Sequence, residues 1–125
     1  MISIVRQFVA AINAGDVPAI AACMTEGHRF IDATGAVHSG RETMRSGWEQ
    51  YLAVFPDYRI EIEEVIAGEA TVAAFGWATG SFHGGKDPVW RIPAAFKATI
   101  RGGLIDEWRV YADIEPMMRS MGIQR

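Results

Sequence analysis

Near the start of the chain, apolar residues recur every three or four positions, which is the pattern of a helix with one buried face. This pattern predicts a helix over Ile2–Ala14, and Gly15 follows where a left-handed helix end is usual. Asp16 can accept hydrogen bonds from free amides and Pro18 suits a first helical turn, so a second, short helix is expected over Val17–Met24. Two helices joined by a tight turn are therefore expected before any strand.

The next segment combines one short strand with the longest predicted helix. His28–Asp32 has the length and the β-forming residues of a strand, and a turn is expected directly after it. Ser39 and Glu42 have the spacing of a capping box, and the apolar residues behind them follow one helical face until Pro56. The pattern indicates a helix that begins near Ser39 and ends before Pro56.

From Tyr58 onward the hydrophobic period changes from that of a helix to that of a strand. Apolar and charged residues alternate until Glu64, where the alternation breaks, so a strand with a bulge near Glu64 is expected. Three more strand-like runs follow, and the glycine pairs between them indicate hairpin turns. The runs are Ala70–His83, Val89–Arg101 and Leu104–Ile114, and the glycine pairs are Gly84-Gly85 and Gly102-Gly103.

The order of these elements predicts a single α+β domain that spans residues 1–125. Helices come first and long antiparallel strands follow, which is typical of helices that cover one face of a curved sheet. A short closing helix is expected over Glu115–Gly122, with Pro116 in its first turn.

Composition narrows the range of functions. Of the 125 residues, 50% are hydrophobic and 22% charged, a balance that supports one buried core without a metal or a disulfide. The formal charge is −3 and the sequence has no basic cluster, which argues against a nucleic-acid partner. The opening apolar run lacks a basic leader and is broken by polar residues, so no membrane span and no secretory signal are expected, and the expected location is cytoplasmic.

Two of the predicted strands carry distinctive faces. On Val89–Arg101 the even-numbered residues are apolar, and the charged residues occupy odd positions. On the last strand, two acids, a guanidinium and a phenol share one side, unless a bulge shifts them: Glu107, Arg109, Tyr111 and Asp113. This side either lines a polar pocket or forms a solvated or dimer-contacting face, and both interpretations stay open.

The chain also has four tryptophans, Trp48, Trp77, Trp90 and Trp108. They either fill the core or, where the sheet curves around a cavity, form the wall of an apolar site that accepts rings. Such a site suits a hydrophobic small molecule.

Six segments, in order along nearly the whole chain, match a known family. They are Phe8–Asp16, Asp32–Gly35, Ser39–Glu42, Phe55–Asp57, Gly80–Gly84 and, above all, Gly102–Gly122. With these segments the chain resembles the SnoaL-like polyketide cyclase family. That family belongs to the nuclear transport factor 2-like superfamily, together with ketosteroid isomerases and limonene epoxide hydrolases.

The resemblance implies a cone-shaped fold, in which a curved, mixed, mainly antiparallel sheet has three N-terminal helices packed on its concave side. It also implies a homodimer formed through the sheet and chemistry without a cofactor. In the family's cyclases an aspartate at the end of the last strand acts as general acid and base, and Asp113 has that motif position. Asp32 matches an aspartate that often follows the first strand. Phe82 stands where the cyclases usually have a histidine, which is a departure from the family pattern.

Closing a ring by an aldol-type step, or shifting a double bond beside a carbonyl, needs a base for a carbon-bound proton and a donor for the enolate oxygen. Asp113 meets the first need if burial beside Trp108 and Tyr111 raises the pKa of its carboxyl from about 4 toward the working pH. Alternatively, Asp113 pairs with Arg109 or caps the closing helix, and its role is then structural.

The other candidates are expected to contact the substrate. Tyr51 and Tyr111 offer phenol donors, and His28 and His83 are candidate pocket neighbours, although all four also fit packing or exposed structural roles. The predicted substrate-binding residues are Trp48, Tyr51, Trp77, His83, Trp90, Trp108, Tyr111 and His28. The histidines are too scattered for a metal site, and no metal is expected.

We therefore expect a small enzyme that performs cofactor-independent acid–base chemistry, of the cyclase or isomerase type, on a hydrophobic carbonyl compound. The rival hypothesis is a non-catalytic ligand-binding or dimerisation module of the same fold. A supporting subunit of a larger oxygenase is a third possibility. Epoxide hydrolysis is less favoured, because an Asp-Arg-Asp set needs an aspartate two residues after Arg91, where Pro93 stands.

Overall fold

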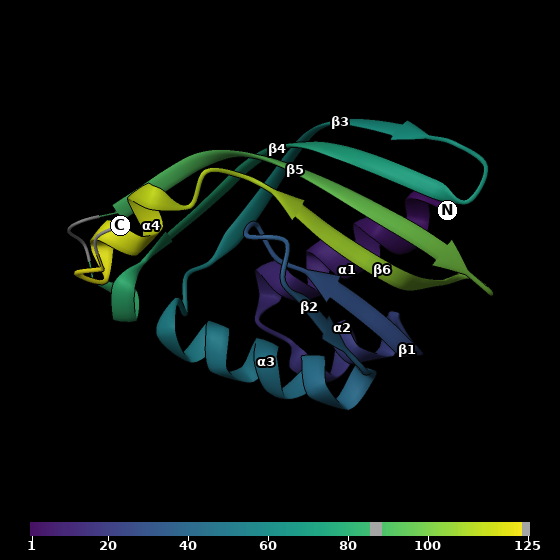
Figure 1. Ribbon diagram of the computed structural model, residues 1–125, viewed down its shortest axis with the longest axis horizontal. Helices are drawn as coiled ribbons and strands as arrows, with labels where there is room; N and C mark the ends of the chain where they lie inside the picture. The colour runs from purple at the N-terminus through teal and green to yellow at the C-terminus, as the bar shows by residue number, and fades with distance from the viewer. Residues whose placement is uncertain (86–88, 124–125) are drawn as a thin grey trace.

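A computed structural model of the protein describes residues 1–85 and 89–123 (Figure 1). The helices are α1 (Ile2–Ala14), α2 (Val17–Ala22), α3 (Arg41–Val54) and α4 (Glu115–Ser120), and a 3-10 turn forms η1 (Phe82–Gly84). The strands are β1 (Met24–Ile31), β2 (Val37–Ser39), β3 (Arg59–Ala67), β4 (Thr71–Ser81), β5 (Val89–Arg101) and β6 (Leu104–Tyr111). Within the described residues, no helix is both long and apolar enough to cross a lipid bilayer.

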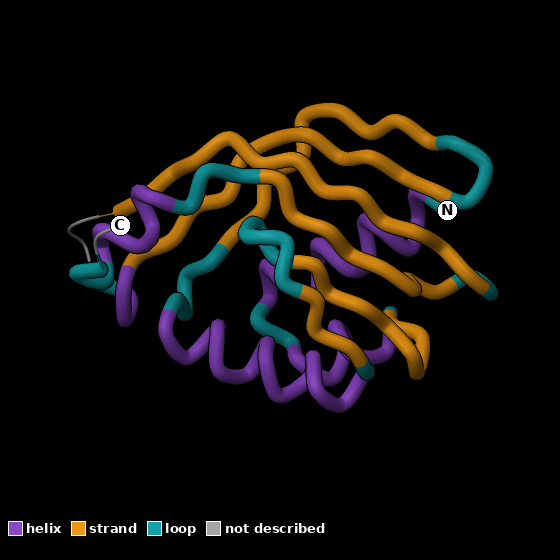
Figure 2. Tube along the Cα trace, viewed as in Figure 1, coloured by secondary structure: helices purple, strands orange, loops and turns teal. Residues whose placement is uncertain are grey.

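The strands form one sheet in the order β2-β1-β6-β5-β4-β3. Neighbouring strands are antiparallel except β1 and β6, which pair in parallel. The sheet is curved, with α1, α2 and α3 on its concave side (Figures 1 and 2). Helix α4 packs beside the beginning of β5 (Figure 1). The predicted fold class, an α+β cone with a mixed, mainly antiparallel sheet, is therefore confirmed.

Two backbone features bend the sheet between β3 and β4. Ile62 pairs with Gly76 while Glu64 pairs with Phe75, so β3 carries one extra residue, and the bulge expected near Glu64 is confirmed. At Gly76 a Cβ atom would lie 1.8 Å from the carbonyl oxygen of Glu61, so only glycine allows the two strands to approach this closely. The bulge and the glycine together let these strands curve over the helices (Figure 2).

A second bulge changes which side chains of β6 face inward. Thr99 pairs with Glu107 and Ile100 pairs with Ile105, so β6 also carries an extra residue. As a result Ile105 and Trp108 are both buried, at 0% and 1% exposure. The bulge that the sequence analysis left open is thus present, and it puts Ile105 rather than the half-buried Leu104 on the same side as Trp108.

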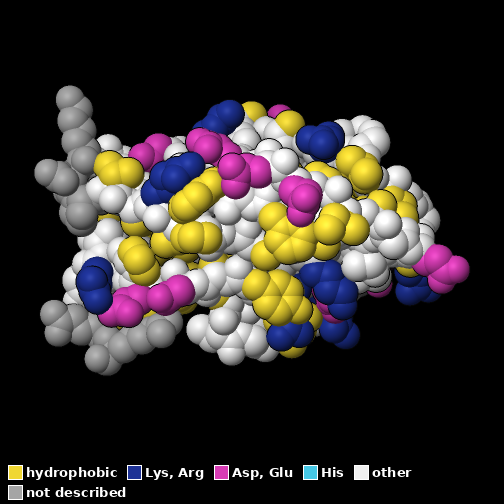
Figure 3. Space-filling model, turned by 90° about the horizontal axis from the view of Figure 1, so that it is seen from above, with side chains coloured by type: hydrophobic (Ala, Val, Ile, Leu, Met, Phe, Trp, Pro, Cys, Tyr) yellow, Lys and Arg dark blue, Asp and Glu magenta, His cyan; other side chains and the backbone are white. Residues whose placement is uncertain are grey.

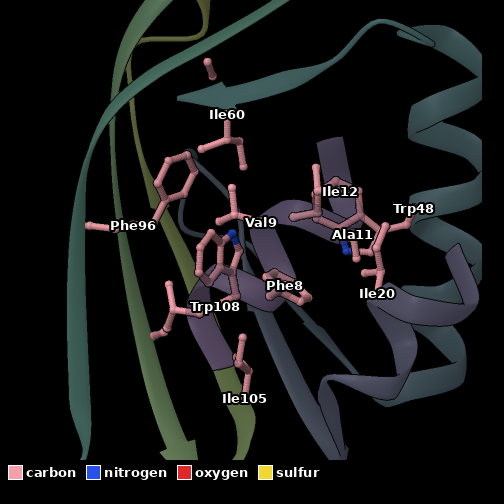
Figure 4. Close-up of a cluster of buried hydrophobic side chains, with 14 of the residues drawn as sticks. Phe8, Val9, Ala11, Ile12, Ile20, Trp48, Ile60, Phe96, Ile105 and Trp108 are labelled. Carbon is pink, nitrogen blue, oxygen red and sulfur yellow. The ribbon is translucent and has the colours of Figure 1, made fainter. Parts of the chain in front are cut away.

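The core lies between α1 and the sheet and is built around aromatic rings (Figure 4). The Trp108 ring stacks on Phe96 with centroids 5.0 Å apart, and the Phe8 ring meets Trp108 edge-on at 4.9 Å. Trp48 reaches from α3 toward Ile12 of α1 (Figure 4). Burying a side chain the size of phenylalanine contributes about 1.5–3 kcal/mol, so this cluster is a main source of stability and holds α1 against the sheet.

Two boundaries in the first part of the chain differ from the prediction. α2 ends at Ala22 rather than Met24, and β1 begins at Met24 rather than His28. The cause is tertiary, because Met24 is fully buried and pairs with Ile105 of β6. The chain therefore joins the sheet earlier than local β propensity indicates.

The capping box expected at Ser39 and Glu42 is wrong. Ser39 ends β2, a strand that the pattern does not predict because its three residues are all exposed. The N-cap of α3 is Gly40, whose φ of 102° is a conformation that favours glycine. Its backbone N–H donates to the carbonyl oxygen of His28 at 2.7 Å, which fixes the start of α3 beside β1.

The later elements agree with the prediction except at their ends. The hairpin turn at Gly102-Gly103 is confirmed, with φ values of 58° and 78°. At the turn expected around Gly84-Gly85 the structure has η1, which ends at Gly84, and residues 86–88 lie outside the described residues. β4 and β6 are shorter than expected, because they end at Ser81 and Tyr111.

Replacing Gly76 by alanine tests the origin of the bend. The new Cβ would overlap the carbonyl oxygen of Glu61, so we expect the free energy of unfolding to fall by about 1–3 kcal/mol or more. Gly27→Ala in β1 is the control, because a Cβ there meets nothing within 4 Å, and we expect a change of about 0.5 kcal/mol or less. Urea denaturation followed by tryptophan fluorescence measures both. Equal effects of the two substitutions would contradict this explanation.

Candidate functional site

A cavity of about 620 Å³ opens between the concave face of the sheet and α3. Its wall is mostly apolar, with side chains from α3, from β1, β2, β4, β5 and β6, and from the segment that runs from the end of β6 into α4. Tyr58, just before β3, also contributes. The aromatic residues among those that line it are Phe30, Trp48, Tyr51, Tyr58, Trp90, Phe96 and Trp108. Four even-numbered residues of β5, Trp90, Ile92, Ala94 and Phe96, line the cavity, in agreement with the apolar side that alternation predicts.

Four of these rings form a continuous aromatic wall. Tyr51 and Tyr58 meet edge-on with centroids 4.9 Å apart. Trp48 lies 5.9 Å from Tyr51, and Trp90 lies 5.9 Å from Tyr58. Gly80 makes room for Trp90, because a Cβ at Gly80 would lie 2.7 Å from the indole ring. The wall is therefore a continuous apolar surface of aromatic rings, which suits flat, apolar molecules.

The two phenols of this wall have little to bond within the protein. The Tyr51 hydroxyl donates to the thioether sulfur of Met117 at 3.5 Å, and thioethers are weak acceptors. Within residues 1–85 and 89–123, no group forms a hydrogen bond with the Tyr58 hydroxyl. Burial raises the pKa of both phenols, and the neighbouring Tyr58 raises that of Tyr51 further. Both therefore stay neutral O–H donors at ordinary pH.

Asp32 and His38 form the ionic part of the lining, at the end of β1 and in β2. The imidazole Nε2–H of His38 donates to Asp32 Oδ2 at 3.0 Å. Asp32 Oδ1 accepts from Thr34 N at 2.9 Å, Thr34 Oγ1 at 2.5 Å and Ala36 N at 3.1 Å. The side chain of Asp32 is 31% exposed and that of His38 46%, so this pair lies where the cavity meets solvent.

The hydrogen bonds of Asp32 decide its charge. Partial burial raises the pKa of the carboxyl, but hydrogen bonds from His38, Thr34 and Ala36 outweigh it and lower the pKa from 3.8 to about 2. Asp32 is therefore a carboxylate at ordinary pH and a poor proton acceptor. Because it holds the proton of His38 on Nε2, the lone pair of neutral His38 is on Nδ1. The pair can thus take up one proton at the imidazole while Asp32 stabilises the cation.

Five of the ten predicted site residues line the cavity: Asp32, Trp48, Tyr51, Trp90 and Trp108. The other five, Asp113, Trp77, Tyr111, His28 and His83, are not among the described residues that line it.

Asp113 lies in the loop between β6 and α4. It is exposed rather than buried beside Trp108, and its Oδ1 accepts from the backbone N–H of Glu115 at 3.0 Å. Glu115 is the first residue of α4, so this contact agrees with the alternative interpretation in which Asp113 supports the closing helix. The catalytic role of Asp113 stays a prediction.

Trp77 and Tyr111 lie on the outer, convex face of the sheet. The indole N–H of Trp77 donates to Glu63 Oε1 at 3.0 Å, and the guanidinium of Arg91 lies 3.8 Å above its ring. Tyr111 is 49% exposed, with Arg109 5.0 Å from its ring. The polar side of β6 is therefore part of a surface, which settles the choice that the alternation left open.

The two histidines predicted to be near the pocket have other surroundings. His83 is exposed in η1 with φ of 54°, and its ring lies 4.1 Å from that of Phe82. His28 is fully buried, and its Nδ1–H donates to the carbonyl oxygen of Ile105 at 2.8 Å. Burial lowers the pKa of His28, so this residue is a neutral core histidine at the junction of β1 and β6.

Most of the lining residues were not predicted as site residues, and two of them, His38 and Tyr58, carry polar groups that could act on a ligand. His38 lies in a strand of three exposed residues, which carries no periodic signal. Tyr58, in contrast, begins the apolar alternation of β3, and that alternation was a usable sign that it faces inward. Within the part of the chain that the structure describes, no group of three or more His, Cys, Asp or Glu residues could hold a metal ion.

Comparison with known proteins gives a consistent family and fold. A family model for the SnoaL-like domain matches residues 5–108. A search of curated proteins found no match. A solved protein with a ketosteroid isomerase-like fold from Catenulispora acidiphila, in complex with trimethylamine, is similar with a TM-score of 0.85 and 20% identity, over 97% of this chain and 93% of that one.

Two further similar structures are described as polyketide cyclases. A proposed SnoaL-like polyketide cyclase from Jannaschia sp. CCS1 has a TM-score of 0.84 and 19% identity, over 99% of this chain and 92% of that one. IdmH, a proposed polyketide cyclase from Streptomyces antibioticus, has a TM-score of 0.78 and 19% identity, over 97% of each chain. At these identities the likeness shows the shared fold.

The buried His28 predicts a specific pH dependence of stability. Because its pKa is lowered from 6.5 in the folded state, the unfolded chain binds the proton more readily, and stability is lost as the pH falls below 6.5. His28→Asn removes the titrating ring but keeps a side-chain N–H for the carbonyl oxygen of Ile105. In this variant the free energy of unfolding should therefore fall less steeply with decreasing pH than in the wild type.

Urea denaturation at several pH values from neutrality downward measures the effect. His83→Asn, which removes an exposed histidine, is the control and should keep the wild-type slope. A slope in His28→Asn equal to that of the wild type would show that His28 does not titrate on unfolding.

Proposed function

The chain belongs to the SnoaL-like domain family, and on that basis we propose that it is a cofactor-independent enzyme that transfers a proton on a hydrophobic carbonyl compound. The observation that carries this proposal is the contact between Asp32 and His38 beside an otherwise apolar, aromatic cavity. The description of the Jannaschia protein as a proposed polyketide cyclase agrees with chemistry of this type.

In the proposed reaction His38 is the general base. Its Nδ1 accepts a proton from the carbon next to the substrate carbonyl, and the C–H bond breaks. The electron pair of that bond forms a C=C bond, and the π pair of the carbonyl moves to oxygen, which gives an enolate. Asp32 keeps the imidazole oriented and stabilises its positive charge while the proton is on it.

Two outcomes complete the reaction without any further reactant. The imidazolium returns the proton to a different carbon, which shifts the double bond, or the enolate carbon attacks a second carbonyl of the same molecule and closes a ring. In the second case the proton passes to the new alkoxide oxygen. Both outcomes restore neutral His38, and the apolar wall of the cavity limits the access of water to the enolate.

Exchange of a carbon-bound proton tests the proposal without knowledge of the natural substrate. 2-Tetralone, a ketone fused to an aromatic ring, should exchange its C1 protons with D2O faster in the presence of the protein, as followed by proton NMR. We expect His38→Ala and Asp32→Asn to lower the exchange rate by about 10²–10⁴-fold, the usual contribution of a general base. Asp16→Asn makes the same carboxyl-to-amide change at the start of α2 and should exchange like the wild type.

Two results would contradict this assignment. One is exchange no faster than in buffer alone. The other is exchange that is lost in Asp113→Asn but kept in Asp32→Asn and His38→Ala, which would return the role of the base to Asp113.

A second candidate function is the non-catalytic binding of a small organic amine. The specific observations are the aromatic wall of Trp48, Tyr51, Tyr58 and Trp90, whose ring faces can attract a cation, and the trimethylamine complex of the Catenulispora protein. Calorimetric titration with trimethylammonium chloride, beside 2-tetralone, separates the two candidates. Tight binding of the amine together with no proton exchange would favour the second.

We also propose that two copies of the chain associate through the outer face of the sheet. An apolar stripe crosses that face, because Phe75 pairs with Ala95 and Ala95 pairs with Tyr111, and Trp77 pairs with Pro93 beside it. Acidic and basic side chains lie among these apolar ones over the upper face (Figure 3). A face that carries both signs of charge around an apolar stripe is able to match a second copy of itself.

The mass of the protein in solution tests this association. Light scattering coupled to gel filtration should give twice the chain mass of 13.7 kDa. Phe75→Glu places a charge in the stripe and should shift the protein to the monomer, whereas Val37→Glu, at an exposed apolar residue of β2, should not. A wild-type protein that stays monomeric, or equal effects of both substitutions, would contradict the proposed interface.

A further inference from the structure

We infer that Gly47, in the middle of α3, sets the width of the ligand that the cavity accepts. It leaves space beside the helix backbone for a flat ketone of three fused rings, and a longer side chain at this position would occupy that space. The inference deepens the proposed function and rests on it in one respect, because it takes the cavity to be the place where the substrate binds. Nothing in the proposed reaction determines how wide that substrate is.

A glycine is unexpected at this position of a helix. Gly47 is the only glycine within the four α-helices that the structure describes, α1 to α4. Apart from proline, glycine is the least favourable residue in a helix interior, because its backbone loses the most freedom when the helix forms. The formation of α3 therefore gives no reason for a glycine here.

The packing around α3 does not require a glycine either. A Cβ atom on Gly47 would lie 3.6 Å from Cε and 3.8 Å from Sδ of Met44, which are ordinary van der Waals distances. Apart from the two neighbouring residues and the backbone of α3, no other described atom lies within 4 Å of that position. Gly76 differs in this respect, because a Cβ there would lie 1.8 Å from the carbonyl oxygen of Glu61. The space beside Gly47 is therefore open.

This open space belongs to the cavity. Gly47 lines it, and so do the residues three and four positions away in both directions: Thr43, Met44, Gln50 and Tyr51. On a helix, residues at these spacings are neighbours on one face. Helix α3 lies across the concave side of the sheet (Figure 1). Gly47 is therefore at the centre of the helix surface that bounds the cavity, and a side chain there would extend into it.

The sheet contributes short side chains to the opposite wall. Ala78 of β4 and Ala94 of β5 are buried and line the cavity, and Ala112, just after β6, lines it as well. The volume of about 620 Å³ is within the range of sites for drug-sized ligands, about 300–1,000 Å³, and exceeds what a two-ring ketone needs. A flat ligand of three fused rings can thus extend from these alanines to the backbone of α3.

Two ketones that differ by one ring test the inference by binding alone. 1-Tetralone has two fused rings, and 1-oxo-1,2,3,4-tetrahydrophenanthrene is the same ketone with a third ring fused to it. Calorimetric titration should show that the wild-type protein binds both. Gly47→Leu should weaken binding of the three-ring ketone by about tenfold or more, because the leucine side chain competes for the same space. Binding of 1-tetralone should change much less.

Two further variants distinguish a role in binding from a role in the fold. Gly47→Ala should melt at a higher temperature than the wild type, because alanine favours a helix and its Cβ makes only ordinary contacts here. Ala53→Leu is the matched control for Gly47→Leu, since it adds a leucine side chain at an exposed residue of α3 that is not among those lining the cavity. It should leave the binding of both ketones unchanged.

Several results would overturn the inference. The first is a wild-type protein that does not bind the three-ring ketone. The second is an equal effect of Gly47→Leu on both ketones, or the same selective loss in Ala53→Leu. A lower melting temperature of Gly47→Ala would also overturn it, because the fold itself would then need the glycine.

The outcomes separate this inference from the proposed function. Selective loss of three-ring binding in Gly47→Leu, together with no proton exchange at C1 of 2-tetralone by the wild type, would support the role of Gly47 and overturn the proposed reaction. Exchange that depends on His38, without any effect of Gly47→Leu on ketone binding, would do the reverse.

Discussion

Strands β3 and β4 approach closely at Gly76, where a Cβ atom would lie 1.8 Å from the carbonyl oxygen of Glu61. The two backbones can lie this close only because glycine has no side chain. This contact lies beside the bulge that separates Ile62 from Glu64 in the pairing. The two features turn a twisted sheet into a concave one, and the inward residues of β4, β5 and β6 then form one wall of a hollow. Helix α1 fills the part near Phe8 and Trp108 (Figure 4), and the cavity lies between the sheet and α3.

The charged and the neutral polar groups occupy different parts of the cavity for a physical reason. A carboxylate is costly to bury, and Asp32 stays at the solvent-facing edge, where a histidine ring, a hydroxyl and two backbone amides satisfy it. Phenols do not have to ionise, so Tyr51 and Tyr58 can be deep in the wall as donors. An ionised carboxylate and neutral phenols can therefore line one small cavity.

Periodicity in the sequence was sufficient for most of the fold and for about half of the site. The helix at Ile2–Ala14, the bulge near Glu64 and the apolar face of β5 follow from local spacing, and the structure agrees with each. The bulge in β6 and the early end of that strand arise from pairing with β5, so the side on which Asp113 lies could not be read from alternation alone. Trp77 has the same residue type as Trp90, and only the strand register shows that they lie on opposite faces. His38 was missed because a strand of three exposed residues has no pattern to detect.

The parallel pairing of β1 with β6 joins parts of the chain that are far apart in sequence. Arg29 bonds Glu107 across 78 positions, and Thr25 bonds Asp106 across 81. Contacts of such long range close late in folding, because the entropy of a long loop has to be overcome first. A ribosome therefore completes His38, Tyr51 and Tyr58 well before it delivers β6, the strand with which β1 pairs. The order of synthesis thus makes the last strand the step that assembles the cavity, and an unfinished chain carries the chemical groups without the site.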